Sequence, residues 1–183
     1  MSGHNKWSQI KHKKEKTDGA KAKVFSKFAK IITVEAKKSK GDKNAANVRS
    51  VIERARAENV TNDVIDRAVK KASEVGGATM ENILYEAYGP GGCAMIIETL
   101  TDNKNKAAQE VKHILSKNGF ALAGQGSALW AFEKNLSTTL EVKDKWLPTM
   151  TVDLSDADLA LLENLVSELE DSDEVQEIFT NAE

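Results

Sequence analysis

Apolar residues recur with a helical period in three successive stretches of the first part of the chain. These positions are Val24, Phe25, Phe28, Ile31 and Ile32, then Val48, Val51, Ile52 and Ala55, then Val64, Ile65, Ala68 and Ala72. Their spacing predicts helices over 18–40, 44–58 and 62–73. Gly41 is the expected stop of the first helix, and Thr61 is the expected N-cap of the third. Three helices joined by short loops form a small bundle.

The pattern changes after Gly76-Gly77, which predicts a hinge. Alternation over 82–88 and a continuous apolar run over 93–100 predict two strands, joined at Gly89-Pro90-Gly91-Gly92 as a β-hairpin. The remaining expected elements are a helix capped by Thr101-Asp102-Asn103 and ending before Gly119, strands over 127–132 and 150–154, a helix capped by Ser155, and a strand over 175–179.

Without its first hairpin strand, the second half has the order β-α-β-β-α-β. This order predicts a ferredoxin-like (split βαβ) antiparallel sheet packed by two helices, with the extra strand on an edge. We therefore expect an α+β protein with two domains. Residues 1–75 form a basic N-terminal arm and a three-helix bundle, and residues 78–183 form the ferredoxin-like domain.

Composition places the chain among ordinary globular proteins, with 40% apolar and 30% charged residues over 183 positions. The single cysteine, Cys93, fits a reducing cytosol, so we expect a cytoplasmic protein. No apolar run is long enough to span a bilayer, and residues 1–16 lack the apolar core of a secretory signal. We expect no membrane partner.

Candidate chemistry is sparse. His4, His12 and His113 share no ligand-like spacing with cysteines or carboxylates, so we expect no metal. Neither a nucleophile–base pair nor a pair of carboxylates stands out, and Cys93 lies in an apolar strand as a buried, inert thiol. We therefore expect no enzyme, no catalytic residue, no cofactor and no small-molecule substrate.

Charge is divided very unevenly along the chain, although the net charge is only −2. Residues 1–73 hold 19 Lys and Arg against 8 Asp and Glu, whereas residues 74–183 hold 7 against 20. Residues 151–183 hold 11 acids and neither Lys nor Arg. Such asymmetry points to a polyanion-binding module joined to a body of opposite charge.

The expected contacts to nucleic acid are the lysines of the arm and the first helix, together with two aromatic residues of the arm that could stack on an exposed base. They are Lys6, Trp7, Lys11, His12, Lys13, Lys14, Lys16, Lys21, Lys23, Lys27 and Lys30. The competing interpretation is a solvated lysine-rich face, with Trp7 as a packing anchor. Few arginines and no recognisable reading helix argue against base-specific recognition.

The acidic second half also has several interpretations. Its acids could form an ordinary solvated face around a helical core stripe. They could instead repel nucleic acid and so confine binding to the first domain. They could also dock a basic ribosomal protein. The sequence does not separate these three.

Several segments together resemble the YebC family, whose members are described as probable transcriptional regulators or, in mitochondria, translational activators of cytochrome c oxidase. The segments are 2–14 (SGHNKWSQIKHKK), 88–92 (YGPGG), 100–105 (LTDNKN), Gly126-Ser127 and 169–182. The resemblance covers most of the chain. It departs from the family at one place, because a third small domain usually inserted in the family is missing around 133–147. The flanking segments should leave from neighbouring strands, so the other two domains should still fold.

The sequence and the resemblance together predict a non-enzymatic nucleic-acid-binding regulator of gene expression, a probable transcriptional regulatory protein of the YebC type. The alternative is a ribosome- or RNA-associated translation factor. A protein-binding adaptor that uses the acidic domain is a third hypothesis. Partners would thus be DNA or RNA, or the ribosome.

Overall fold

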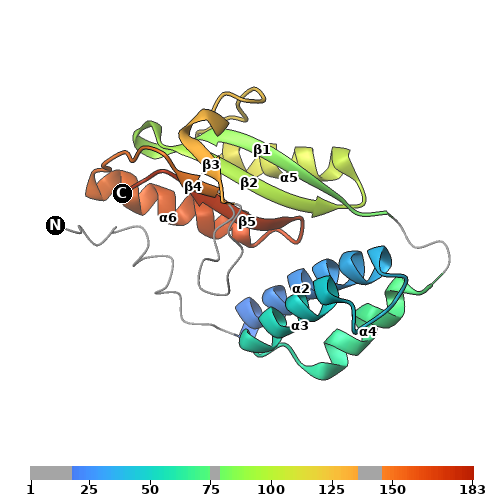
Figure 1. The fold of residues 1–183 in the computed structure, drawn as a ribbon. Coiled ribbons are helices and arrows are strands. Elements are labelled where there is room, and N and C mark those ends of the chain that lie inside the picture. The colour runs from blue at the N-terminus through green and yellow to red at the C-terminus, as the bar shows by residue number, and fades with distance from the viewer. Residues whose placement is uncertain (1–17, 75–78, 136–145) are drawn as a thin grey trace. The chain divides into compact units, whose positions relative to one another are not determined.

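The computed structural model describes residues 18–74, 79–135 and 146–183, which divide into two compact units (Figure 1). The helical unit extends to residue 81, and the sheet unit comprises residues 82–183. The hinge predicted at Gly76-Gly77 lies outside the described residues.

Three helices build the helical unit: α2 (Asp18–Lys38), α3 (Ala46–Ala57) and α4 (Asn62–Ala72). They confirm the three predicted helices, with ends that differ by at most two residues. Helix α2 packs against both of the others. Thr61 holds the N-cap position of α4 as predicted, although its side chain accepts no cap hydrogen bond.

The core of the helical unit is apolar throughout. It contains Ile32, Ala36, Val48, Val51, Ile52, Ala55, Val60, Ile65, Ala68 and Ala72, with Phe25 and Phe28 packed against it. Each large side chain removed from water in this way contributes about 1.5–3 kcal/mol. Burial of one stripe from each helix therefore stabilises α3 and α4 in particular, because helices of 12 and 11 residues are marginal in isolation.

A glutamate interrupts the apolar pattern of α2, and the structure explains it. The Glu35 carboxylate accepts hydrogen bonds from Lys38 Nζ at 2.6 Å and Asn47 Nδ2 at 2.9 Å, which ties α2 to α3. Partial burial raises the pKa of Glu35, but these hydrogen bonds outweigh it and lower the pKa below its ordinary value. Gly41, at φ +82°, then ends the helical segment as predicted, by donating to the Ala36 carbonyl at 2.8 Å.

The sheet unit contains five strands, two α-helices and two short 3-10 turns in its described part. In chain order they are β1 (Glu81–Tyr88), η1 (Pro90–Gly92), β2 (Ala94–Thr101), α5 (Lys104–Lys117), η2 (Leu129–Ala131), β3 (Phe132–Lys134), β4 (Trp146–Pro148), α6 (Asp156–Glu170) and β5 (Val175–Thr180). The α+β class and the order β-α-β-β-α-β after β1 are confirmed.

The main sheet has the strand order β1-β2-β5, so the extra hairpin strand lies on an edge, as predicted. Strands β2 and β5 pair antiparallel, with Met95 opposite Thr180 and Glu98 opposite Glu177. A bulge at Gln176 shifts the register before Thr99 meets Val175. The other two strands, β3 and β4, form a separate antiparallel pair.

Two predicted strands do not form as expected. Residues 127–131 fold into turns and η2, because their backbone N–H groups are bonded within the loop or to a buried carboxylate. Residues 150–154 make only a single bridge, from Val152 to Ala182. The strands near these places are β3 and β4, which begin at Phe132 and Trp146.

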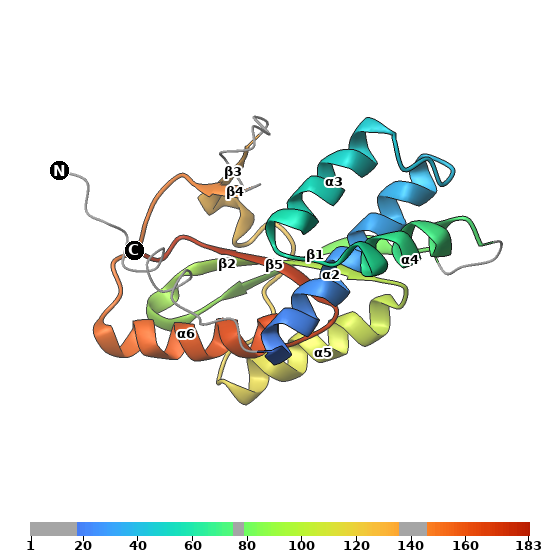
Figure 2. The ribbon, with the colours of Figure 1, turned by 90° about the horizontal axis from the view of Figure 1, so that it is seen from below.

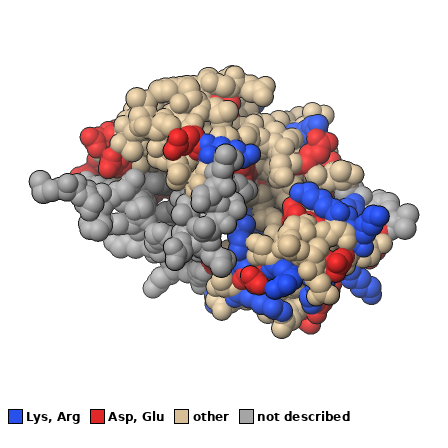
Figure 3. Space-filling view, viewed as in Figure 1, with Lys and Arg blue, Asp and Glu red and all other residues tan. Residues whose placement is uncertain are grey.

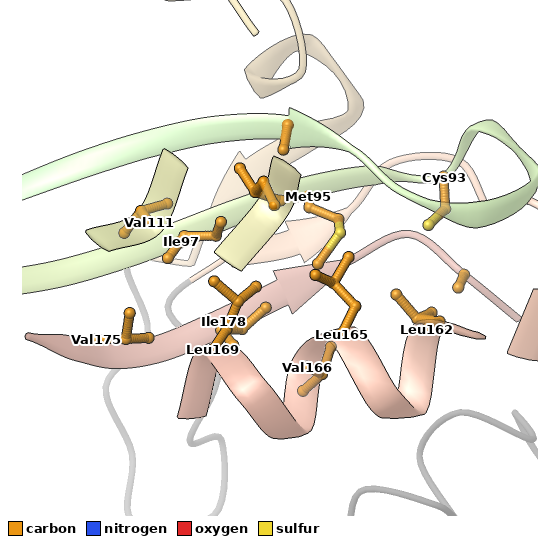
Figure 4. Packing of buried hydrophobic residues seen from close by; sticks show 13 residues of the cluster. Cys93, Met95, Ile97, Val111, Leu162, Leu165, Val166, Leu169, Val175 and Ile178 are labelled. Carbon is orange, nitrogen blue, oxygen red and sulfur yellow. The ribbon is translucent and has the colours of Figure 1, made fainter. Parts of the chain in front are cut away.

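Side chains bury both faces of the main sheet. Helices α5 and α6 cover one face and enclose a core that includes Met95, Ile97, Leu162 and Leu165 (Figure 4). A second cluster, which includes Ala128, Ala131, Phe132 and Trp146, covers the other face. Figure 2 shows β3 and β4 on the side of the main sheet away from α5 and α6. A strand buried on both faces has a continuous apolar pattern, which is what β2 shows.

Candidate nucleic-acid interface

Seven of the predicted contact residues lie outside the described residues. They are Lys6, Trp7, Lys11, His12, Lys13, Lys14 and Lys16. Their role therefore stays a prediction from the sequence.

The other four predicted contacts lie on α2, and the helix brings three of them together. Lys23, Lys27 and Lys30 follow the spacing i, i+4, i+7, so they share one side of the helix. Lys37, a further seven residues on, continues this row. Lys21 lies on a different side. We call Lys23, Lys27, Lys30 and Lys37 the lysine row.

The apolar packing of α2 directs the lysine row away from the core of the helical unit. Phe25, Phe28, Ile32 and Ala36 face α3 and α4, roughly opposite the row on a helix with 3.6 residues per turn. Thr33 further fixes the orientation of α2, because its Oγ1 donates to the Ala68 carbonyl at 3.2 Å. The core of the helical unit therefore fixes which side of α2 carries the lysine row.

Sequence reasoning missed four exposed cations on α3 and α4. Arg49, Arg54, Lys70 and Lys71 have neither an ion pair nor a side-chain hydrogen bond among the described residues, whereas Arg56 and Arg67 make hydrogen bonds. Lys43, by contrast, is paired with Asp66. An unpaired, exposed cation can neutralise a phosphate without first breaking a protein contact. Only their exposure, which the sequence alone does not give, marks them as candidates.

Charge on the sheet unit is arranged differently (Figure 3). Its lysines are partly engaged: Lys106 pairs with Glu174 at 2.9 Å, and Lys117 pairs with Glu168 at 3.1 Å. Glu174 is only 4% exposed, and the hydrogen bond to it raises the pKa of Lys106. Figure 3 shows Lys and Arg gathered mainly over the helical unit. The Lys and Arg side chains of the described residues are thus concentrated on α2, α3 and α4.

The structure assigns structural roles to the other candidates of the second half. Cys93 is fully buried, and this burial raises the pKa of its thiol, as expected for an inert cysteine. Asn103 accepts from Lys106 N and so caps α5, as predicted. Gly91, at φ +62°, lies against Leu154 in the β1–β2 turn. Within the described ranges, no group of three or more His, Cys, Asp or Glu is placed to hold a metal.

Glu86 is a buried carboxylate that sequence reasoning did not single out. It is 5% exposed, and it accepts from the backbone N–H groups of Gly126, Ala128 and Leu129 at 2.6, 2.7 and 2.8 Å. Burial raises the pKa of Glu86, but the three hydrogen bonds outweigh that effect and lower it. Glu86 therefore fixes the loop before η2 onto β1.

The described helices include none that is long and apolar enough to cross a membrane.

The fold and the charge distribution define a two-unit α+β protein whose helical unit presents cations. The chain belongs to the TACO1/YebC family. Residues 5–75 match the family's N-terminal domain, and residues 80–143 match its second and third domain.

The chain is similar to curated relatives over its whole length. It is 36% identical to the "Probable transcriptional regulatory protein Teth39_1009" of Thermoanaerobacter pseudethanolicus, over 100% of this chain and 97% of the relative. It is 37% identical to a "Probable transcriptional regulatory protein" of Thermosipho africanus, over 100% of this chain and 94% of the relative.

A solved structure shares the fold. The "Conserved Hypothetical Protein Aq1575" of Aquifex aeolicus is 27% identical and superposes with a TM-score of 0.81, over 97% of this chain and 96% of that chain. The Thermoanaerobacter alignment has 239 positions against 183 residues here, so at least 56 positions have no counterpart in this chain. This is the short form of the family that the resemblance implied.

Proposed function

We propose that this protein is a non-enzymatic, cytoplasmic regulator of gene expression that binds nucleic acid through its basic arm and the lysine row of α2. The carrying observation is that Lys23, Lys27 and Lys30 share the side of α2 opposite the apolar core of the helical unit, where each side chain is half-buried. The arm adds Lys6, Lys11, Lys13, Lys14 and Lys16 directly before this helix in the sequence. Together they neutralise phosphates along one stretch of backbone.

The names of the relatives support the regulatory role and, within it, transcription. The chemistry supports backbone binding. Lysines contact phosphates as point charges and release counterions, which yields affinity without sequence preference. The four arginines of the helical unit lie on α3 and α4, and none lies on α2. The lysine row therefore has no arginine beside it on α2 that could read guanine through two hydrogen bonds.

The second candidate is a translation factor that binds structured RNA or the ribosome. The same absence of arginine from α2 favours it, because backbone contacts that ignore sequence suit a folded RNA as well as a DNA duplex. DNA and RNA are therefore compared directly in one experiment.

The experiment is a salt titration of binding to duplex DNA, structured RNA and purified ribosomes. We expect a steep fall of affinity with salt. The double variant Lys11→Glu/Lys14→Glu should weaken binding to every sequence about equally and reduce the salt slope by about 2. Lys27→Glu tests the lysine row separately. Its matched control is Lys112→Glu, an exposed lysine of α5 that should leave the slope unchanged.

The outcomes separate the candidates. Tight association with ribosomes alone would exclude the transcriptional role. A failure to bind all three at physiological salt would contradict nucleic-acid binding altogether. Equal losses for Lys27→Glu and Lys112→Glu would show that net charge matters and the lysine row does not.

A further inference from the structure

Two aromatic side chains of the sheet unit are exposed although they are held in place by hydrogen bonds. Tyr88 is 38% exposed and Trp130 is 59% exposed. The Tyr88 hydroxyl donates to the Ser127 carbonyl, and Trp130 Nε1 donates to the Tyr88 hydroxyl at 3.1 Å. The polar atoms of both rings thus have hydrogen-bond partners within the protein. The exposed part of each side chain is therefore its aromatic ring, which a ligand can contact.

Glu86 anchors the loop that leads into this aromatic pair. It precedes Tyr88 by two residues on β1, so both side chains lie on the same face of the strand. Its carboxylate holds the N–H groups of Gly126, Ala128 and Leu129, which flank Ser127 and lead directly into Trp130. A surface fixed in advance loses little conformational entropy on binding.

The surroundings of the pair carry little charge, although the unit as a whole is acidic. Residues 119–132 contain no charged residue, and residues 82–135 hold 5 Lys against 5 Asp and Glu. The 11 acids of residues 151–183 include those of α6, which covers the opposite face of the main sheet. Figure 3 shows the part of the sheet unit that lies uppermost as a broad area with few charged side chains. A polyanion can approach this area without strong local repulsion.

We infer that Tyr88 and Trp130 form a stacking platform for an unpaired nucleobase of single-stranded nucleic acid. The inference rests on the proposed function, because the basic arm and lysine row bring the nucleic acid to the chain. An exposed aromatic ring binds the face of any base, and the faces are accessible only where bases are unpaired. The platform therefore distinguishes single strands from duplexes without reading sequence, which the lysines cannot do.

The chemistry of the platform suits any unpaired base and does not select one particular base. Its donors and acceptors are used internally, so it offers no pattern of hydrogen bonds for one particular base. The shared chemistry of RNA and DNA single strands is the base, so both are expected ligands. Separate arms of the experiment compare them.

The test measures fluorescence anisotropy with labelled 12-nucleotide strands, oligo(U) and oligo(dT), and with a DNA duplex of equal length, at one salt concentration. Trp130→Ala should weaken binding of both single strands about tenfold, as expected for loss of one stacked base, and should change duplex binding less than twofold. Trp130→Phe keeps a ring and should retain most of the affinity. The matched control is Leu161→Ala, since Leu161 is 55% exposed on α6 and should have no effect.

The outcomes are distinguishable from failure of the proposed function. If the protein binds the duplex and Trp130→Ala changes neither strand, or changes strand and duplex equally, the platform is wrong and backbone binding remains. If the unaltered protein binds no nucleic acid, both proposals fail. If Trp130→Ala only dissociates oligomers, seen by light scattering after size exclusion, the surface contacts protein and the platform is wrong. Circular dichroism of each variant confirms that it is folded.

Discussion

The two units of this protein treat polar side chains in opposite ways. Among the described residues, all seven buried polar or charged side chains lie in the sheet unit and none lies in residues 18–74. Asn181 illustrates the difference: it is 2% exposed, and its Oδ1 accepts from Ala94 N at 2.7 Å to join the C-terminus to β2. The helical unit has an apolar interior and keeps its charges on the surface.

Helix starts show the same difference. In the sheet unit, Asn103 accepts from Lys106 N and Ser155 accepts from Asp158 N, so both α-helices have a side-chain cap. In the helical unit, the N-cap residues of α3 and α4 are Ala45 and Thr61, and neither makes a side-chain cap hydrogen bond. A buried polar network fixes one arrangement of its loops, whereas apolar packing leaves a surface free to carry charge. One unit is built to position loops, and the other is built to present cations.

The largest expected effect comes from the two cores. Leu165 and Ile65 are both fully buried, so Leu165→Ala and Ile65→Ala should each lower the free energy of unfolding of their own unit by about 2–5 kcal/mol. Urea unfolding followed by circular dichroism measures this loss. Ile65→Ala should also weaken duplex binding under conditions where it populates the unfolded helical unit, and Leu165→Ala should not. Equal loss of duplex binding in both variants would contradict the division of labour between the units.

The second effect concerns the Glu86 carboxylate. Glu86→Gln keeps the shape but turns one acceptor oxygen into a donor, which leaves buried N–H groups of the loop without a partner. We expect a loss of about 2–3 kcal/mol, because hydrogen bonds to a buried charge are strong and an unsatisfied donor is costly. The matched control is Glu133→Gln, an exposed glutamate of β3, which should change stability by less than about 0.5 kcal/mol.

The same variant has a defined pH dependence. The pKa of Glu86 in the folded protein is lowered, so its stabilisation is present above the unfolded-state value of about 4.3 and is lost as pH falls through the folded value. The difference in stability between the unaltered protein and Glu86→Gln should therefore be constant near neutral pH and shrink below about pH 4. A difference that grows towards acid pH would mean that Glu86 does not stabilise the loop as a carboxylate.

The smallest effect separates the helix caps. Ser155→Ala removes a hydrogen-bonded cap and should lower stability by about 1 kcal/mol, as measured by urea unfolding. Thr61→Ala removes a side chain that accepts no cap hydrogen bond and should have a smaller effect. Equal losses would show that Thr61 caps α4 in solution, and the contrast between the units would then rest on buried side chains alone.

Local signals in the sequence predicted most of the elements. Apolar periodicity located the five α-helices of the described residues. The caps at Asn103 and Ser155 were predicted because a cap depends on residues only three positions apart. The β1–β2 hairpin followed from alternation and from the glycines of its turn. Family resemblance came from short motifs at both ends and in the middle of the chain.

Long-range contacts were not predictable in the same way. Residues 127–131 have the composition of a strand, but Glu86, about forty positions earlier, takes their backbone donors and bends them into a turn. The sequence did not single out Glu86, because a polar residue is expected at this position of an alternating strand. Its partners are backbone N–H groups, which no residue type marks in the sequence. The hydrogen bond between Trp130 and Tyr88 was not predictable either, because the two residues lie 42 positions apart in the sequence. Which of the lysines share a side of α2, by contrast, follows from helical spacing alone.

The pairing of β3 with β4 offers a site for protein engineering. Lys134 lies opposite Trp146, and residues opposite each other in an antiparallel pair have their Cα atoms about 4.5–5.5 Å apart. A guest domain whose own termini are adjacent could be spliced between these two positions without pulling the strands apart. The pair packs on the sheet face that carries the loop of Glu86, so a guest domain inserted there would be tethered to the same face as that loop.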